Sequence, residues 1–352
     1  MKRKAIAALP AIRFCAAVIL CAAVLCGTAL SEGPVIVSLG DSYSSGEGIE
    51  PFYGQDAEFA VRCADQDWLA HRSEKSWPGM LTLPGVDGPM RDHRGENWFF
   101  AAASGALTDH LFLLTEEEKA AGITAQQEKP YSREGISGTA MLDPQMDVFD
   151  ELDRLGLKAD YVTVSIGGND IGFKQTVALS MMGTTAYLPG DTVEEKAASL
   201  WKEKYTADGV RAKIKRVFTD IAARAGDQAC IIVAGYPRPL APEGGGDDGF
   251  PPESAQIMNA ATLLFNEELR DIVEECRREG MDICFVSVEE AFEGHGAYSE
   301  DPYINPVYAG AKGQDLKDVL VASSYSMHPN EKGAEAYARC VQAVIDSLEA
   351  AK

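Results

Sequence analysis

The sequence lacks several motifs by which enzymes are commonly identified. It contains no CxxC pair and no Cys/His spacing of the kind that binds zinc. It has no HExxH motif, no Gly-x-Ser-x-Gly nucleophile elbow, and no Lys-Ser/Thr pair after the glycine-rich stretch at 40–46. The glycine-rich segment at 244–248 lacks the alternating carboxylates of an EF-hand, so we interpret it as a flexible loop. These absences exclude kinase-like phosphate loops and zinc proteases, and we expect no metal and no cofactor.

Basic residues are also few. The chain has 32 Lys and Arg against 54 Asp and Glu, which gives a formal net charge of −22. A surface of this sign repels phosphate backbones and anionic membranes, so we expect no nucleic-acid partner. Beyond the first thirty residues no apolar run is long enough to cross a bilayer, and we therefore expect no stable membrane span. We expect a monomer that is kept soluble by its charge.

The N-terminus has the pattern of a targeting segment. Four basic residues come before the apolar run Phe14–Leu25, which is too short for a durable membrane span. Small residues then predict cleavage of a signal peptide, residues 1–29, after Ala29. Lipid attachment at Cys21 or Cys26 stays open, although each follows a leucine where a lipobox has a small residue. We expect residues 30–352 to form a single domain with loop insertions, and the protein to be secreted.

Five cysteines remain after the predicted cleavage site. Export to an oxidising compartment makes disulfides an expectation, and the odd number leaves at least one thiol outside any internal bridge. The connectivity cannot be deduced from the sequence. The five residues are Cys63, Cys230, Cys276, Cys284 and Cys340.

Apolar runs alternate with amphipathic stretches along the chain. The runs that predict strands are Val35–Leu39, Trp98–Ala103, Tyr161–Ile166, Ala229–Gly235 and Ile283–Val288. The helical patterns are Asp143–Leu155, Val210–Ala225, a helix capped by Ser254 that runs to Cys276, and a last helix capped by Asn330. This alternation predicts an α/β fold, a three-layer αβα sandwich around a five-stranded, parallel, doubly wound sheet of the flavodoxin-like kind. Loop insertions are expected at 49–69, 115–139, 173–205, 237–252 and 293–322.

Two residues next to these elements carry reactive groups. Ser42 follows the first predicted strand at a sharp Gly-Asp-Ser bend, at the sheet edge where open α/β folds bind ligands. A serine at this place also commonly turns a loop or caps a helix. His328 stands before Pro329 and Asn330, which fix the turn into the last helix. An imidazole at the same edge is able to take a proton from Ser42 and return it to a leaving group.

Three short motifs occur in order along the chain: GDSY at 40–43, GGND at 167–170 and HPN at 328–330. Together they resemble the GDSL/SGNH hydrolase family. The flanking segments SGAL at 104–107 and IGGNDIGF at 166–173 are most similar to its secreted actinobacterial esterases and lipases. The resemblance implies the same α/β sandwich.

The resemblance also assigns roles to residues of this chain. It implies that Ser42 is the nucleophile and His328 the base. It further implies an oxyanion hole made of the backbone N–H groups of Ser42 and Gly105 and the side-chain amide of Asn169. A glycine at 105 leaves the backbone open to close approach, and a neutral amide donates without first losing a proton. Asp170 is expected to brace its loop and to take no part in the chemistry.

At one position the chain departs from the family pattern. Most members carry an aspartate three residues before the histidine, where this chain has Tyr325. Some relatives use a backbone carbonyl instead, so we expect the Tyr325 carbonyl to orient the ring of His328. The alternative is a carboxylate from upstream, with Asp315 and Asp318 as the candidates.

We therefore expect a secreted, metal-independent serine esterase or lipase that forms an acyl-enzyme on a small-molecule or lipid ester. An acyltransferase and an inactive binding module on the same fold are the alternatives. The acyl chain length and the alcohol cannot be deduced. Apolar residues of the 173–205 insertion are expected either to line an acyl pocket or to form a helical cover with its own core. They are Phe173, Met181, Met182, Tyr187 and Leu188.

Overall fold

The computed structural model describes residues 33–133, 136–207, 209–245, 249–308 and 323–352. Its centre is a five-stranded sheet with the order β2-β1-β5-β6-β7, in which every neighbouring pair is parallel. The predicted five-stranded parallel sheet is therefore confirmed. The strands are β1 (Ile36–Gly40), β2 (Trp98–Phe100), β5 (Tyr161–Ser165), β6 (Cys230–Ala234) and β7 (Ile283–Val286).

All residues of four strands are buried, which explains why these segments are apolar and β-branched on both faces. β2 ends at Phe100, three residues before the predicted end. The next residues turn out of the ladder, because the N–H groups of Ala101 and Ala102 both donate to Ser38 O. The strand therefore gives way to a loop that lies beside the end of β1.

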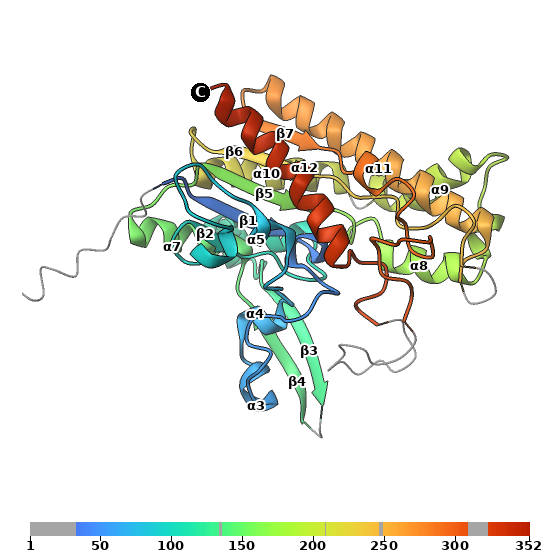
Figure 1. Ribbon diagram of the computed structural model, residues 1–352, viewed down its shortest axis with the longest axis horizontal. Coiled ribbons are helices and arrows are strands. Elements are labelled where there is room, and N and C mark those ends of the chain that lie inside the picture. The colour runs from blue at the N-terminus through green and yellow to red at the C-terminus, as the bar shows by residue number, and fades with distance from the viewer. Residues whose placement is uncertain (1–32, 134–135, 208, 246–248, 309–322) are drawn as a thin grey trace, which may run out of the picture.

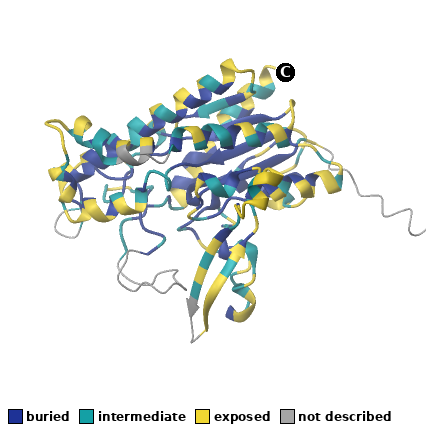
Figure 2. Cartoon of the chain, turned by 180° about the vertical axis from the view of Figure 1, so that it is seen from behind, coloured by how far each residue is buried: buried dark blue, intermediate teal, exposed yellow. Residues whose placement is uncertain are grey.

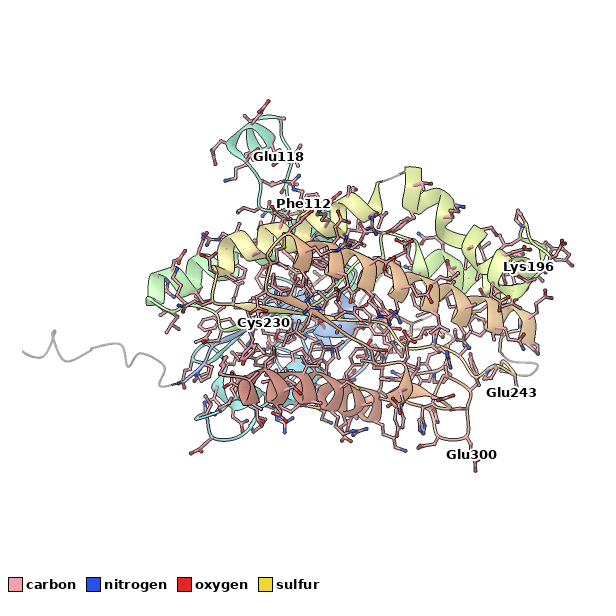
Figure 3. The ribbon with its side chains drawn as sticks, turned by 90° about the horizontal axis from the view of Figure 1, so that it is seen from above. Phe112, Glu118, Lys196, Cys230, Glu243 and Glu300 are labelled. Atoms are coloured by element: carbon pink, nitrogen blue, oxygen red, sulfur yellow. The ribbon has the colours of Figure 1, made fainter. Side chains whose placement is uncertain are left out.

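Helices cover both faces of the sheet (Figure 1). α12 and α5 pack together on one face, and α7, α10 and α11 lie on the other (Figure 3). This arrangement confirms the predicted αβα sandwich. The helices are α2 (Ser42–Ser45), α3 (Phe59–Arg62), α4 (Gln66–Leu69), α5 (Trp77–Met80), α6 (Glu116–Ala120), α7 (Val148–Leu155), α8 (Phe173–Met181), α9 (Val193–Ala207), α10 (Val210–Ala225), α11 (Pro252–Arg278) and α12 (Glu331–Ala350).

Helix boundaries follow local capping chemistry in α12 but not in α11. Asn330 caps α12 as predicted, because its side chain accepts the N–H of Gly333. Ser254 was predicted to cap α11, but the helix begins two residues earlier, at Pro252. The hydroxyl of Ser254 instead bonds with that of Thr185, 2.8 Å away. A tertiary hydrogen bond therefore replaces the predicted cap.

The predicted loop at 115–139 contains structure that the sequence did not indicate. An antiparallel hairpin, β3 (Gln127–Arg133) and β4 (Ile136–Leu142), projects from the sandwich (Figure 1) and is largely exposed (Figure 2). Its polar strands have no clear apolar alternation, which is why their sequence resembles that of a loop. A small second core anchors its base; it comprises Phe59, Trp68, Leu69, Ala70, Ala103 and Leu142.

The preceding part of this insertion lies over α10. Arg216 forms a bidentate pair with Glu118 and stacks on Phe112, with its guanidinium 4.1 Å from the ring centroid. Figure 3 shows Phe112 and Glu118 on the outer side of that helix. The insertion is thus held at one end by a charged pair and at the other by apolar contacts.

The predicted disulfides are absent: all five described cysteines are free thiols. Cys230 and Cys284, on adjacent strands, interact as thiols rather than as a bridge. No helix among the described residues combines the length and the apolar character needed to cross a membrane. The predicted signal peptide lies outside the described residues.

Candidate active site

The bend that carries Ser42 is fixed from both sides. Gly40 has φ +125°, and a Cβ there would stand 2.4 Å from Ser165 O, so only glycine fits. The side-chain amide of Gln145 binds both the N–H and the C=O of Gly40, each at 2.8 Å. Ser42 is then the first residue of α2, at the carboxyl end of β1. This geometry presents Ser42 at the sheet edge.

Asp41 locks the same turn. Its carboxylate accepts the N–H of Tyr43 and the hydroxyls of Ser165 and Tyr236, the last at 2.6 Å. Burial raises the pKa of Asp41 to about 6, although these hydrogen bonds oppose the shift. The side chain caps α2 by accepting the N–H of Tyr43.

His328 lies in a loop that a neighbouring segment holds in place. The backbone of Asn305 bonds to both Met327 and His328, and the hydroxyl of Tyr43 donates to Met327 O. Met327 has φ +63°, a strained conformation for a residue with a side chain. The imidazole is thereby fixed next to the ring of Tyr43, at a centroid distance of 5.4 Å.

The carbonyl that meets the imidazole belongs to Ser326, not to Tyr325. His328 Nδ1 lies 3.0 Å from Ser326 O, whereas Tyr325 O accepts the backbone N–H of His328. The prediction for Tyr325 is therefore wrong, because the left-handed turn at Met327 directs a different carbonyl to the ring. Since a carbonyl only accepts, Nδ1 carries the proton and Nε2 is left as a base. The alternative carboxylates, Asp315 and Asp318, lie outside the described residues.

Two loops supply the groups predicted for an oxyanion hole. Gly105 has φ +75°, and its N–H makes no hydrogen bond within the described part of the chain. Asn169 Nδ2 donates one hydrogen to Ala106 O at 2.9 Å, which leaves its second hydrogen free to bind a ligand. Asp170 accepts the N–H and the hydroxyl of Thr108, which fits the bracing role predicted for it. The loop after β2 and the loop after β5 are thus joined by two sets of hydrogen bonds.

The four predicted groups line one cavity of about 850 Å³, which is within the usual range for ligand sites. Ser42, Gly105, Asn169 and His328 all contribute to its wall. Among the described contacts, no hydrogen bond joins Ser42 Oγ to the imidazole. Such bonds are often long before substrate binds and shorten in the complex.

One part of the cavity wall is apolar. The 173–205 insertion contributes Phe173, Met181 and Met182 to this wall, three of the five residues expected either to line an acyl pocket or to form a helical cover. Tyr187 is 89% exposed and Leu188 packs on the main core. These two residues therefore neither line the cavity nor form a separate core under a helical cover. The wall includes Phe173, Val177, Met181, Met182, Met258 and Phe265.

A buried carboxylate that the sequence did not suggest lies near the imidazole of His328. Glu47 is buried, and its Oε2 is 2.7 Å from His71 Nδ1. Gly48, the next residue, packs so closely that a Cβ there would stand 3.3 Å from His328 Cβ. Burial lowers the pKa of His328, and the charge of Glu47 partly offsets that shift. No cluster of three metal-binding side chains occurs in the described ranges.

Sequence comparison identifies relatives of the chain. The model of the GDSL-like Lipase/Acylhydrolase family matches residues 38–336. A lipase of Streptomyces rimosus is 27% identical over 272 residues, covering 77% of this chain and 76% of the relative. An esterase of Streptomyces scabiei is 27% identical over 232 residues, covering 62% of this chain and 56% of the relative.

Solved structures of Streptomyces enzymes are also similar to this chain. The extracellular lipase from Streptomyces rimosus aligns with a TM-score of 0.52 at 22% identity, over 89% of this chain and 99% of that one. A phospholipase A1 from Streptomyces albidoflavus aligns with a TM-score of 0.54 at 18% identity, over 90% and 99%. These likenesses show a shared fold. Because the family model spans most of the chain, and with it all three motifs, the protein belongs to the GDSL-like lipase/acylhydrolase family and is an ester hydrolase.

Proposed function

We propose that the protein is a secreted serine esterase or lipase that hydrolyses carboxylic esters through an acyl-enzyme on Ser42. One observation carries the proposal: a nucleophile, a base and two neutral hydrogen-bond donors line a single cavity that continues into an apolar pocket. Secretion is supported by the N-terminal segment and by the extracellular lipase among the structural relatives.

In the proposed mechanism, His328 Nε2 takes the proton as Ser42 Oγ attacks the ester carbonyl carbon. The negative charge that develops on the carbonyl oxygen is met by the N–H groups of Ser42 and Gly105 and by Asn169 Nδ2. His328 then gives its proton to the leaving alcohol as the ester C–O bond breaks. Water, deprotonated by the same imidazole, then attacks the acyl carbon. The bond from that carbon to Ser42 Oγ breaks, the imidazole returns the proton to Ser42 Oγ, and the carboxylic acid leaves.

The substrate we propose is an ester with an acyl chain of medium or greater length. The apolar wall formed by α8 and α11 is suited to hold such a chain while the ester reaches Ser42. The names of the relatives, a lipase and a phospholipase A1, agree with a lipid substrate.

Rapid mixing with p-nitrophenyl esters of increasing acyl length tests the proposal. We expect a burst of p-nitrophenol of about one equivalent, followed by steady turnover, and a preference for longer chains. Ser42→Ala should abolish both phases. The control Ser347→Ala, at an exposed serine of α12, should leave them unchanged. Binding without turnover in the unmodified protein would support the inactive binding module instead.

A further inference from the structure

The β3–β4 hairpin has no part in the mechanism described so far, yet it contacts the loop after β2 that carries Gly105. Gln127 and Lys129 are alternate residues of β3 and so project from the same face of the strand. Gln127 Nε2 and Lys129 Nζ each donate a hydrogen bond to Ser104 O, both at 2.8 Å. One backbone carbonyl thus receives two side-chain donors from an insertion.

The carbonyl of Ser104 belongs to the peptide whose N–H is that of Gly105. The only cis peptide in the described ranges is Glu50–Pro51, so the Ser104–Gly105 peptide is trans. In a trans peptide the C=O and N–H bonds point in opposite directions. The hairpin therefore holds the carbonyl end of this peptide, and the N–H of Gly105 lies at the opposite end; Ser104 and Gly105 both line the cavity.

The rest of the loop is held by other groups. Arg72 donates to the carbonyls of Ala101 and Ala102, at 3.0 and 2.9 Å. The N–H of Ser104 donates to Ala70 O. The peptide between Ser104 and the next residue has no such support from the described part of the sandwich, and the hairpin supplies it.

Lys129 brings a positive charge as well as a hydrogen bond. No carboxylate among the described residues lies within ion-pair distance of its ammonium, so the Ser104 carbonyl receives that charge directly. A cation on the carbonyl oxygen polarises the peptide, and hydrogen bonds linked in this way strengthen one another. The N–H on the far side becomes a stronger donor to a developing oxyanion.

Gln127 gives up a hydrogen bond to take this position. It is buried, and its Oε1 has no partner within the described chain. A buried amide oxygen without a partner carries a free-energy cost. This orientation therefore serves the contact that Nε2 makes with Ser104.

We propose that Lys129, supported by Gln127, is a positioning residue of the oxyanion hole. It fixes and polarises the Ser104–Gly105 peptide so that the N–H of Gly105 binds the tetrahedral intermediate more strongly than the substrate. This inference rests on the proposed function, because it requires Gly105 to be an oxyanion donor.

Lys129 also lines the cavity, so a second role must be separable by experiment. A lysine there could instead bind an anionic group of the substrate. The two roles differ in their dependence on substrate charge. A polarised peptide affects neutral and anionic esters alike, whereas an anion subsite affects only the anionic ester.

The charge state of Lys129 gives an independent readout. Burial lowers the pKa of Lys129 to about 8; the charge of Arg72 adds to this shift and Glu47 opposes it. Lys129 is therefore charged below pH 8 and loses its charge as the pH rises through that value. Other titratable groups that line the same cavity are Asp41, Tyr43, Glu128, Lys174, Tyr236 and His328.

The experiment compares the wild type with Lys129→Met on p-nitrophenyl butyrate and on the anionic mono-p-nitrophenyl glutarate. We expect kcat to fall about tenfold on both esters, about 1.4 kcal/mol of barrier, with KM changed less than twofold. The kcat of the wild type should decline above about pH 8, and that decline should be missing in Lys129→Met. The matched control Lys158→Met, which removes an exposed lysine, should keep both kcat and its pH profile.

A loss confined to the anionic ester would overturn the proposal in favour of an anion subsite. Unchanged kcat in a folded Lys129→Met protein would also overturn it, as would a wild-type kcat that stays level through pH 8. The wild-type profile needs no variant, so the test holds even if the substitution impairs folding. If the wild type hydrolyses no p-nitrophenyl ester of any acyl length, the proposed function fails; if it hydrolyses these two esters and Lys129→Met matches it, only this inference fails.

Discussion

The edge of the sheet and the insertions around it contribute to the same cavity by different physical means. At the edge, Ser42 follows a fully buried strand, and Asp41 and Gln145 fix its turn through buried hydrogen bonds. The hairpin is exposed over most of its length and reaches the site through two side chains, Gln127 and Lys129. Buried backbone ladders are the most stable parts of a protein, whereas exposed hairpins open more easily. The comparison indicates that the edge places the reacting groups and the insertions adjust them.

Among single substitutions outside Ser42 and His328, removing an oxyanion donor at the edge should have the largest effect on kcat. Asn169→Ala should lower kcat by roughly 10²–10³-fold, which is typical for one such donor. KM should change little, because the bond matters mainly in the transition state. Steady-state kinetics on p-nitrophenyl butyrate measures both constants. A variant with unchanged kcat would remove Asn169 from the oxyanion hole.

A substitution in the 173–205 insertion should change substrate specificity and leave the hydrolysis of short esters unchanged. Val177 is buried in the apolar wall, so Val177→Phe should fill part of the pocket. We expect kcat/KM for a p-nitrophenyl ester of a long-chain acid to fall about tenfold, within the range for altered apolar contacts. The value for the acetate should stay within about twofold.

The control for this change is Tyr187→Ala, which alters an exposed residue of the same insertion. Both chain lengths should be hydrolysed as by the wild type. Equal losses on the acetate and the long-chain ester in Val177→Phe would show that α8 supports the catalytic groups, and the division between edge and insertion would not hold.

The pH dependence should report the burial of the base. His328 acts as a base only when neutral, and its pKa is lowered mainly by burial. Activity should therefore persist as the pH falls through 6.5, the usual value for histidine, and be lost only at lower pH. A profile of kcat/KM on p-nitrophenyl acetate tests this, and an acid limb centred above 6.5 would contradict it.

The smallest effect should come from Tyr325. Its hydroxyl bonds to Glu50 Oε1 at 2.5 Å, and its carbonyl bonds to the backbone of His328 rather than to the ring. Tyr325→Phe should keep kcat within about threefold, under ~1 kcal/mol of barrier. Asp315→Asn and Asp318→Asn should also retain most activity. A collapse in either, with folding intact, would reveal a carboxylate partner and end the idea of a dyad supported by a carbonyl.

Parts of this arrangement that depend on local sequence could be predicted. The five strands are apolar runs, four of them buried on both faces, and the Asn330 cap acts within one turn of its helix. The bend after the first strand predicts Ser42 at the sheet edge, and the family resemblance implies that Asn169 lies at the same site. The expectation of disulfides rested on the predicted export alone, and the five described cysteines are free thiols.

Contacts that depend on tertiary structure or on a single backbone angle could not be predicted. The carbonyl of Ser326 reaches the imidazole only because Met327 adopts a positive φ, which a non-glycine residue seldom does. The polar strands of the hairpin gave no alternation that would reveal Lys129, and its partner is 25 residues away in the chain. The amide of Gln145 likewise binds a backbone 105 residues away.

The central claim is that Ser42 forms a covalent intermediate at the sheet edge. Treatment with an alkyl phosphonate that carries a p-nitrophenyl leaving group, followed by mass spectrometry of the intact protein and its peptides, tests it most directly. We predict one adduct per chain, on the peptide that contains Ser42, with loss of activity in proportion to labelling and no adduct in Ser42→Ala. An adduct that persists in Ser42→Ala, or that maps to another residue while activity is lost, would contradict the account.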